Sequence, residues 1–224
     1  MIPWTRLAST TVPGDGGQMR LLRRGAEFSI RVANTELMNS RIYGSEDALA
    51  ELACERLAER TRPRLLIGGL GMGFTLAGVL RRVEAKASVV VSELVPAVVG
   101  WNRHEMAEVN GAALEDARVT VLERDVAEVI RAGRGAYDAI LLDVDNGPSA
   151  LTAKANDRLY SLAGLRTAFA ALRPRGILAI WSSGDDPAFT RRLAHAGFQA
   201  EAVRVRARGR AGGARFRIWL ARRP

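Results

Sequence analysis

The chain has 224 residues, 48% of them hydrophobic, which suits one soluble domain with its own core, or one domain with a small extension. Its single cysteine excludes an intramolecular disulfide, and its two histidines, His104 and His195, lack a Cys or His at ligand spacing, so we expect no metal site. The formal net charge is +9, but lysine occurs only at Lys86 and Lys154, so we attribute the charge to an Arg-favouring base composition and do not expect a nucleic-acid partner.

The first residues carry no long apolar run, so we expect no secretory signal, no membrane anchor and a cytoplasmic location. Short apolar stretches at residues 19–22 and 28–32, with a third near Leu37, predict a small N-terminal β-element over residues 1–44. A helix is expected from Ser45, as its N-cap, through about Glu59. This helix would open a second unit, residues 45–224, which we interpret as a Rossmann-like, nucleoside-binding catalytic domain.

After Pro63 the pattern changes to apolar strands that alternate with helical segments, which is typical of a parallel sheet. Strands are expected at residues 65–67, 88–92, 119–122, 139–142 and 177–181, and helices at 74–82, 96–104, 126–132, 162–172 and 187–196. The last two strands, near 199–206 and 216–221, are joined by a glycine-rich turn, which predicts an antiparallel hairpin at the sheet edge. We therefore predict an α/β fold with a doubly wound, seven-stranded, mostly parallel sheet of the S-adenosylmethionine-dependent methyltransferase type.

A strand that runs into glycines gives the strongest local signal. Gly68, Gly69, Gly71 and Gly73 follow the strand at residues 65–67 and precede a predicted helix. Glycines let the backbone turn tightly and approach a ligand closely at the carboxyl end of a first strand. We interpret these glycines as cofactor-binding, the alternative being that they serve packing alone.

Acidic residues end the next two strands. Glu93 ends the second strand, where a carboxylate can accept hydrogen bonds from both ribose hydroxyls. Asp125 follows the third strand, where its carboxylate can receive the adenine amino group, cap the helix that begins at Val126, or do both. The glycines, Glu93 and Asp125 at three successive strand ends together predict a site for an adenosine moiety, and we expect S-adenosylmethionine or its decarboxylated form as the cofactor.

The fourth strand ends in two carboxylates, Asp143 and Asp145, over the same crevice. In a doubly wound sheet this position faces the reacting end of a nucleotide ligand. Two nearby acids can hold a cationic amine and remove its proton as it attacks an electrophilic carbon, and burial raises a carboxyl pKa toward neutrality. We interpret both as catalytic, the alternative being that they cap the next segment.

From Phe28 to Trp181 the chain resembles the spermidine synthase group of aminopropyltransferases, which act in polyamine biosynthesis. The similar stretches are Ile67-Gly-Gly-Leu-Gly-Met-Gly73, Ser92-Glu93-Leu, Arg124-Asp125-Val, Tyr137-Asp-Ala-Ile-Leu-Leu-Asp143, Gly147-Pro148, Leu159-Tyr160 and Leu172-Arg-Pro-Arg-Gly176. The resemblance implies that the glycines and Glu93 hold the nucleoside and that Asp125 holds the adenine. It also implies that Asp143 is the base and that Asp145 assists the amine. The family's N-terminal β-element takes part in dimerisation and in closing the acceptor site, so we keep a homodimer open.

The chain departs from the family pattern at three places. Gly71 stands where the family's loop carries an Asp that binds the aminopropyl amine. The family's Asp-Ser-Ser-Asp-Pro loop is shortened to Asp143-Val-Asp145-Asn146, and its Tyr-His-Glu segment is reduced to Tyr43-Gly-Ser-Glu46. These departures indicate a divergent bacterial subgroup.

The resulting hypothesis is aminopropyl transfer from decarboxylated S-adenosylmethionine to a small-molecule amine acceptor. A first alternative keeps the fold and transfers the methyl group of S-adenosylmethionine to a small molecule. A second alternative is an RNA-binding or RNA-modifying protein that uses the Arg-rich C-terminal strands. In Val203-Arg-Val-Arg-Ala207 arginines alternate with apolar residues, which favours a strand with a solvated Arg face over a polyanion site.

Overall fold

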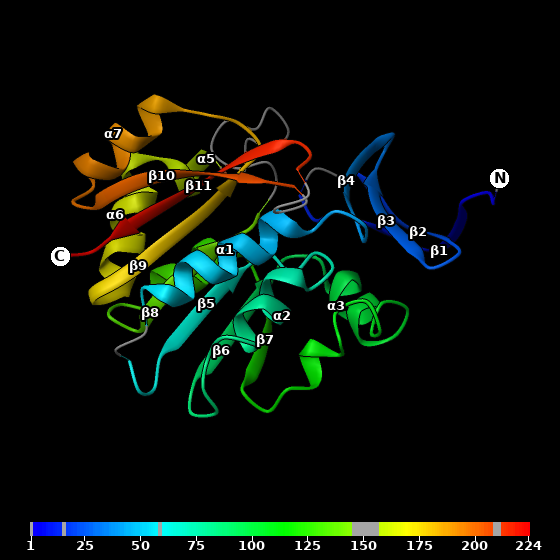
Figure 1. Ribbon diagram of the computed structural model, residues 1–224, viewed down its shortest axis with the longest axis horizontal. Coiled ribbons are helices and arrows are strands. Elements are labelled where there is room, and N and C mark those ends of the chain that lie inside the picture. The colour runs from blue at the N-terminus through cyan, green and yellow to red at the C-terminus, as the bar shows by residue number, and fades with distance from the viewer. Residues whose placement is uncertain (1, 15–16, 58–59, 145–156, 208–211) are drawn as a thin grey trace.

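The described residues form two sheets, a smaller one of four strands and a larger one of seven (Figure 1). A computed structural model describes the chain except for residues 1, 15–16, 58–59, 145–156 and 208–211. The smaller sheet is an antiparallel meander of β1 (Thr5–Thr11), β2 (Gln18–Arg24), β3 (Glu27–Val32) and β4 (Thr35–Asn39). The expected N-terminal β-element is therefore present. Its first strand escaped the sequence analysis because the stretch Thr5–Thr11 is mostly polar and exposed.

The larger sheet has the strand order β10-β11-β9-β8-β5-β6-β7. Its strands are β5 (Arg64–Gly68), β6 (Ser88–Glu93), β7 (Val119–Glu123), β8 (Tyr137–Leu142), β9 (Leu172–Ser182), β10 (Gln199–Arg206) and β11 (Arg215–Arg222). Strands β5 to β9 pair in parallel, whereas β11 is antiparallel to β9 and β10 is antiparallel to β11. The predicted fold class is confirmed, including the terminal hairpin.

Helices cover both faces of the larger sheet (Figure 1). They are α1 (Gly44–Glu55), α2 (Phe74–Leu80), α3 (Pro96–Arg103), α4 (Val126–Ala132), α5 (Asp157–Tyr160), α6 (Leu162–Ala171) and α7 (Pro187–His195), with a short 3-10 helix at Ala113–Glu115. The apolar residues of α1, α2 and α3 share one buried cluster with one face of the sheet, and those of α4 to α7 share a second cluster with the other face. None of the helices in the described part of the chain is both long and apolar enough for a membrane span.

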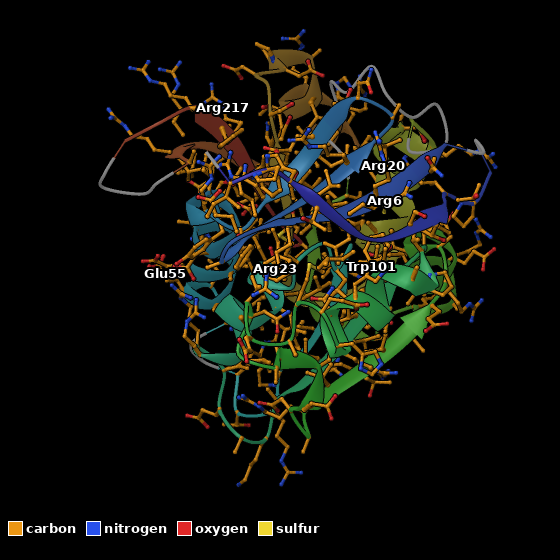
Figure 2. All side chains as sticks on the ribbon, turned by 90° about the vertical axis from the view of Figure 1, so that its right-hand side faces the viewer. Arg6, Arg20, Arg23, Glu55, Trp101 and Arg217 are labelled. Atoms are coloured by element: carbon orange, nitrogen blue, oxygen red, sulfur yellow. The ribbon has the colours of Figure 1, made fainter. Side chains whose placement is uncertain are left out.

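The smaller sheet is built into the first of these clusters. Its Leu21 and Ile30 are buried together with Leu49 of α1 and Leu70 of the glycine-rich loop. Figure 2 looks onto this sheet, whose strands carry the labelled Arg6, Arg20 and Arg23. The smaller sheet therefore packs on the same side of the molecule as α1, α2 and α3.

Alternation along β10 follows the predicted pattern. Arg204 and Arg206 are exposed, whereas Val203 and Val205 pack against the first cluster. The solvated Arg face of this strand is therefore confirmed.

The start and end of α1 differ from the prediction. Ser45 is not the N-cap, because the helix already begins at Gly44 and Tyr43 occupies the cap position without a side-chain hydrogen bond. The Ser45 hydroxyl instead donates to the Glu46 carboxylate over 2.5 Å. The Gly44 N–H donates to the Ala207 carbonyl oxygen over 2.9 Å, which ties the first turn to the terminal hairpin. The helix ends at Glu55, four residues earlier than expected.

A buried carboxylate joins three strands at the edge of the sheet opposite the glycines. Asp138, at the beginning of β8, has a side chain only 1% exposed. Its Oδ2 accepts hydrogen bonds of 2.8 Å from the Arg64 backbone N–H of β5 and from the Arg173 guanidinium of β9. Arg60 approaches the other carboxylate oxygen at 3.4 Å. This interaction fixes the register at which β8 enters the sheet.

We expect the Asp138→Ala substitution to lower the free energy of unfolding by about 3 kcal/mol, because it leaves a buried N–H and a partly buried guanidinium without their acceptor. Urea denaturation measures the loss. The control is Glu128→Ala, which breaks the exposed pair of Glu128 with Arg124 and should cost less than about 1 kcal/mol. Equal losses in the two variants would contradict this role for Asp138.

Candidate functional site

The glycine-rich loop follows β5 at the carboxyl edge of the larger sheet. Gly69, Gly71 and Gly73 have φ angles of 87°, 52° and 79°, a region that side-chain-bearing residues rarely adopt. A Cβ atom at Gly69 would overlap the backbone carbonyl oxygen of Asp143. A Cβ atom at Gly68 would lie 2.7 Å from a methyl carbon of Val126, so this glycine has a packing reason as well. The sequence-predicted glycines thus bring the loop against the end of β8.

Two buried asparagines hold the loop from the α3 side. Asn102 donates its side-chain amide to the Gly71 carbonyl oxygen over 2.8 Å, and Asn110 donates to the Met72 carbonyl oxygen over 3.0 Å. The two amides also bond to each other over 2.6 Å. The sequence analysis missed both residues, since nothing local distinguishes them from exposed asparagines near a helix end.

Glu93 ends β6 and contacts the same loop. Its carboxylate is buried and accepts the Leu70 N–H over 2.8 Å and the Val95 N–H over 2.9 Å. Burial raises the pKa of the Glu93 carboxyl above its usual value, although the surrounding backbone N–H groups act in the opposite direction. The backbone N–H groups of Leu94 and Gly71 also act on this carboxylate, so its acceptor sites serve mainly the loop, and hydrogen bonds to ribose hydroxyls stay a prediction.

Asp125 lies one strand further along the edge, after β7. Its exposed side chain accepts the Ala127 N–H over 2.8 Å and caps α4. The capping role considered in the sequence analysis is confirmed, and an interaction with adenine stays a prediction.

Asp143 follows β8 and is held from two sides. Its backbone N–H donates to the Gly68 carbonyl oxygen over 2.9 Å, and its Oδ2 accepts the Thr75 hydroxyl over 2.6 Å. Burial raises the pKa of Asp143 to about 6, although the Thr75 hydrogen bond acts against the rise. Thr75 was not predicted, although its place in the first turn after the glycines is a usable signal. Asp145 lies outside the described residues.

A second carboxyl group, that of Glu46 in the first turn of α1, interacts with Asp143. Burial and the negative charge of Asp143 raise the pKa of Glu46 to about 7, although the Ser45 hydroxyl acts against the rise. Two neighbouring carboxyls in a desolvated site favour retaining one proton between them. The sequence analysis named Glu46 only as the remnant of a family segment and did not include it in the site.

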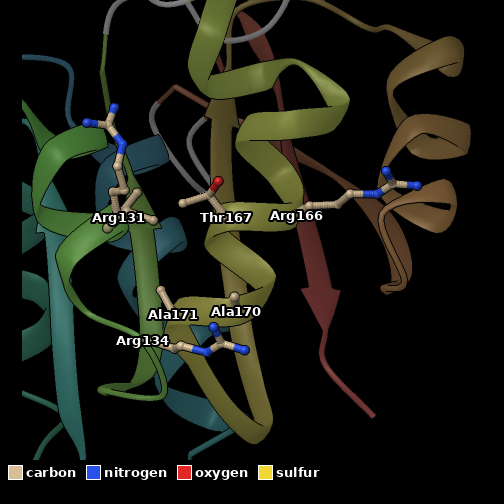
Figure 3. A pocket seen from close by; sticks show the side chains of 7 residues that line it. Arg131, Arg134, Arg166, Thr167, Ala170 and Ala171 are labelled. Atoms are coloured by element: carbon tan, nitrogen blue, oxygen red, sulfur yellow. The ribbon is translucent and has the colours of Figure 1, made fainter.

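Of the predicted residues in the described part of the chain, the four glycines, Glu93 and Asp143 are joined by direct contacts, whereas Asp125 stands apart at the end of β7. The described residues contain no cluster of three or more His, Cys, Asp or Glu side chains with the geometry of a metal site. A shallow hollow between α4 and α6 is unrelated to this edge. Figure 3 shows the guanidinium groups of its Arg131, Arg134 and Arg166 at separate places around the hollow, so they do not converge on one anion.

The chain is similar in sequence to a curated protein. No protein-family model matches the chain. A polyamine aminopropyltransferase from Corynebacterium efficiens is 33% identical over 130 residues, which are 57% of this chain and 24% of that protein. The chain thus spans about a quarter of the length of this curated relative.

Solved structures agree in fold over almost the whole chain. A spermidine synthase from Thermotoga maritima has a TM-score of 0.74 at 14% identity, covering 98% of this chain and 73% of that one. A spermidine synthase in complex with the transition-state analogue AdoDATO gives 0.74 at 14% identity, covering 98% and 72%. A probable spermidine synthase from Corynebacterium glutamicum gives 0.66 at 13% identity, covering 98% and 79%.

The sheet order and these structures define the class of the protein as an α/β protein with a methyltransferase-like fold. Within that class the chain is similar to the spermidine synthase group, because the curated relative is named a polyamine aminopropyltransferase and the three structures are named as certain or probable spermidine synthases. The resemblance drawn from the sequence is therefore confirmed.

We expect Gly69→Ala to lower the free energy of unfolding by at least about 2 kcal/mol, because the residue has a positive φ and its Cβ would meet the Asp143 carbonyl. Thermal or urea unfolding tests this. The same substitution at Gly100 in α3, where a Cβ meets nothing within 4 Å, should instead stabilise by up to about 1 kcal/mol. A tolerated alanine at position 69 would contradict the close approach.

The coupled carboxyls predict a pH dependence of stability. Their folded pKa values of about 7 for Glu46 and about 6 for Asp143 exceed the ordinary 4.5 and 3.8, so the folded state retains protons that the unfolded state has lost. Stability therefore falls as the pH rises from about 4.5 through about 7. Glu46→Gln removes one titrating group and the charge beside Asp143. The stability of this variant should therefore fall less than that of the wild type as the pH rises, as measured by urea midpoints across this range. Glu55→Gln, on an exposed side chain of the same helix, is the control and should decline like the wild type.

Proposed function

We propose that the chain is a transferase that moves an alkyl group from a sulfonium nucleoside to an amine, specifically the aminopropyl group of decarboxylated S-adenosylmethionine. The observation that carries the proposal is the Asp143 carboxyl. It is desolvated, held by Thr75 and adjoins the glycine loop, with a pKa of about 6. A carboxylate of this kind, near neutrality and beside a nucleoside loop, suits proton removal from an amine.

The residues around the loop fit a nucleoside. Three glycines at positive φ shape the loop at the end of the first parallel strand, and Glu93 adjoins the loop through the Leu70 N–H. The resemblance assigns both to the nucleoside. Asp125, at the end of β7, is assigned to the adenine by the resemblance. The bound donor supplies the electrophilic carbon next to its sulfonium sulfur.

Proton transfer is the chemistry that this chain contributes. In an in-line displacement the amine nitrogen forms a bond to the donor carbon while the carbon–sulfur bond breaks, and the amine proton passes to Asp143. With a pKa of about 6, Asp143 is ionised at neutral pH and can accept that proton. The pair of Glu46 and Asp143 keeps about one negative charge near neutrality, which favours a cationic amine over a neutral one. Asp145 would assist the amine by the same resemblance.

The similar proteins support this choice of reaction by their names, which are polyamine aminopropyltransferase and spermidine synthase. An amine acceptor is the corresponding expectation for this chain.

Methyl transfer from S-adenosylmethionine is the second candidate, and one observation favours it. Gly71 offers no carboxylate to the donor's amine, and the Met38 thioether of β4 packs against it, at 2.7 Å from where a Cβ would be. A contact that would select the decarboxylated donor is thus replaced by an apolar one. The two reactions differ in product, since aminopropyl transfer yields methylthioadenosine and methyl transfer yields S-adenosylhomocysteine.

We expect Asp143→Asn to reduce turnover by roughly a hundredfold to ten-thousandfold, the usual effect of removing a general base, while nucleoside binding persists. Product analysis by mass spectrometry, with each sulfonium donor and a panel of amines, measures the reaction. Thermal shift with methylthioadenosine measures binding. Asp185→Asn, at an exposed residue beyond β9, is the control and should keep full activity. Unchanged turnover in Asp143→Asn would refute the assigned role, and no product with either donor would refute the transferase proposal.

A further inference from the structure

Trp181 lies beside Asp143 at the carboxyl edge of the sheet. Strands β8 and β9 run in parallel, and Leu142 of β8 pairs with Ile180 of β9. The next residues, Asp143 and Trp181, are therefore neighbours on adjacent strands. Because side chains alternate along a strand, both are directed to the same face. The Thr75 hydrogen bond identifies that face as the one covered by α2, and Trp181 packs against the buried cluster of this same face.

The indole N–H of Trp181 is buried and has no hydrogen-bond acceptor among the described residues. Trp219, on the other face of the sheet, differs in this respect, since its indole N–H donates to the Thr190 hydroxyl over 3.0 Å. Buried donors are nearly always paired in folded proteins, so an unpaired one calls for a partner that the protein itself does not supply, such as a water or a ligand. Trp181 is therefore a donor in need of an acceptor next to the proposed base.

The strand order separates the two halves of the site. The glycine loop and Glu93 lie on β5 and β6, on one side of β8, whereas Trp181 lies on β9, on the other side. A nucleoside held by the glycines and Glu93 occupies the first side. Trp181 thus belongs to the half in which the attacking amine must lie.

Aromatic rings lie in both halves, one pair on β9 and β11 and the other beside the end of the glycine loop. Trp181 packs against Phe216 of β11 with ring centroids 5.0 Å apart. Tyr43, just before α1, stacks on Phe74, the residue before Thr75, with centroids 4.4 Å apart. Aromatic faces attract cationic groups, so these rings and the two carboxyls together suit an amine-bearing molecule.

We propose that the Trp181 indole N–H binds the acceptor substrate, an inference that rests on the proposed function. The acceptor then carries a neutral oxygen, such as a hydroxyl, near its reacting amine. A simple aliphatic diamine does not satisfy the indole. Its ammonium group has only donors, and the lone pair of its reacting nitrogen is directed at the donor carbon.

The charge of the site selects among oxygen groups. A carboxylate or phosphate on the acceptor would face Glu46 and Asp143, and like charges in a desolvated site repel strongly. A hydroxyl can accept a hydrogen bond from the indole N–H and donate a hydrogen bond to one of the carboxyls, so that each of these polar groups has a partner. The acceptor class is thus an amino alcohol or a hydroxylated diamine.

A matched pair of acceptors tests the proposal. Wild-type protein and Trp181→Phe are assayed with diaminobutane and with diaminobutanol, which differ by one hydroxyl. We expect the wild type to prefer diaminobutanol in kcat/KM by about tenfold, the typical effect of one hydrogen bond, and Trp181→Phe to lose that preference while still using diaminobutane. Equal use of both amines by the wild type, or a preference that survives in Trp181→Phe, would overturn the proposal.

A binding measurement separates this inference from the proposed function. In nitrogen-15-labelled protein the Trp181 indole resonance, assigned by its absence in Trp181→Phe, should shift when diaminobutanol is added together with methylthioadenosine. The Trp219 indole, already bonded to Thr190, is the internal control and should not move. A stationary Trp181 resonance overturns the inference even if transfer is observed. A shift without turnover of either amine supports the inference and counts against the transferase proposal alone. If Trp181→Phe does not fold, two wild-type results decide the question. They are the preference between the two amines and the shift of the Trp181 resonance, which is then assigned by substituting each of the other tryptophans.

Discussion

The close approach of the glycine loop to the end of β8 is the constraint on which the rest of the site depends. The Asp143 N–H bonds to the Gly68 carbonyl, and Gly69 leaves no space for a side chain against the Asp143 carbonyl. This contact fixes where Asp143 leaves the sheet and directs its carboxyl toward Thr75 in the first turn of α2. Loop, base and helix are thus held as one unit by backbone geometry, and the asparagines behind the loop keep it in that conformation.

The carboxyls at this edge differ in burial and in the hydrogen-bond donors around them, and this difference suggests different roles. Glu93, Glu46 and Asp143 are desolvated, which raises the pKa of each. Several backbone N–H groups stabilise the Glu93 carboxylate, which therefore holds the loop. Glu46 has the Ser45 hydroxyl and its own backbone N–H as donors, and Asp143 has the Thr75 hydroxyl. A buried carboxylate takes up a proton most readily where few hydrogen-bond donors stabilise its charged form. Asp125 stays in solvent and caps a helix, a position better suited to recognition than to chemistry.

Most of the fold was predictable because strand and helix periods are local properties. The parallel strands, the terminal hairpin and the residues at three strand ends follow from short stretches of sequence. The strand Thr5–Thr11 was missed because it buries little, and Ser45 was misread as a cap because its hydroxyl bonds to Glu46 instead. Glu46, Thr75 and Trp181 enter the site only through packing between α1, α2 and the sheet, which no local pattern reports.

Met38 gives the smaller sheet a direct influence on the loop. Its thioether occupies the space that any side chain at position 71 would need. Because this thioether is the end of a flexible side chain, a carboxylate at position 71 would require Met38 to turn aside or residue 38 to be smaller. Residue 38 on β4 and residue 71 in the glycine-rich loop are far apart in the chain, so the smaller sheet helps to decide which side chains the loop can carry.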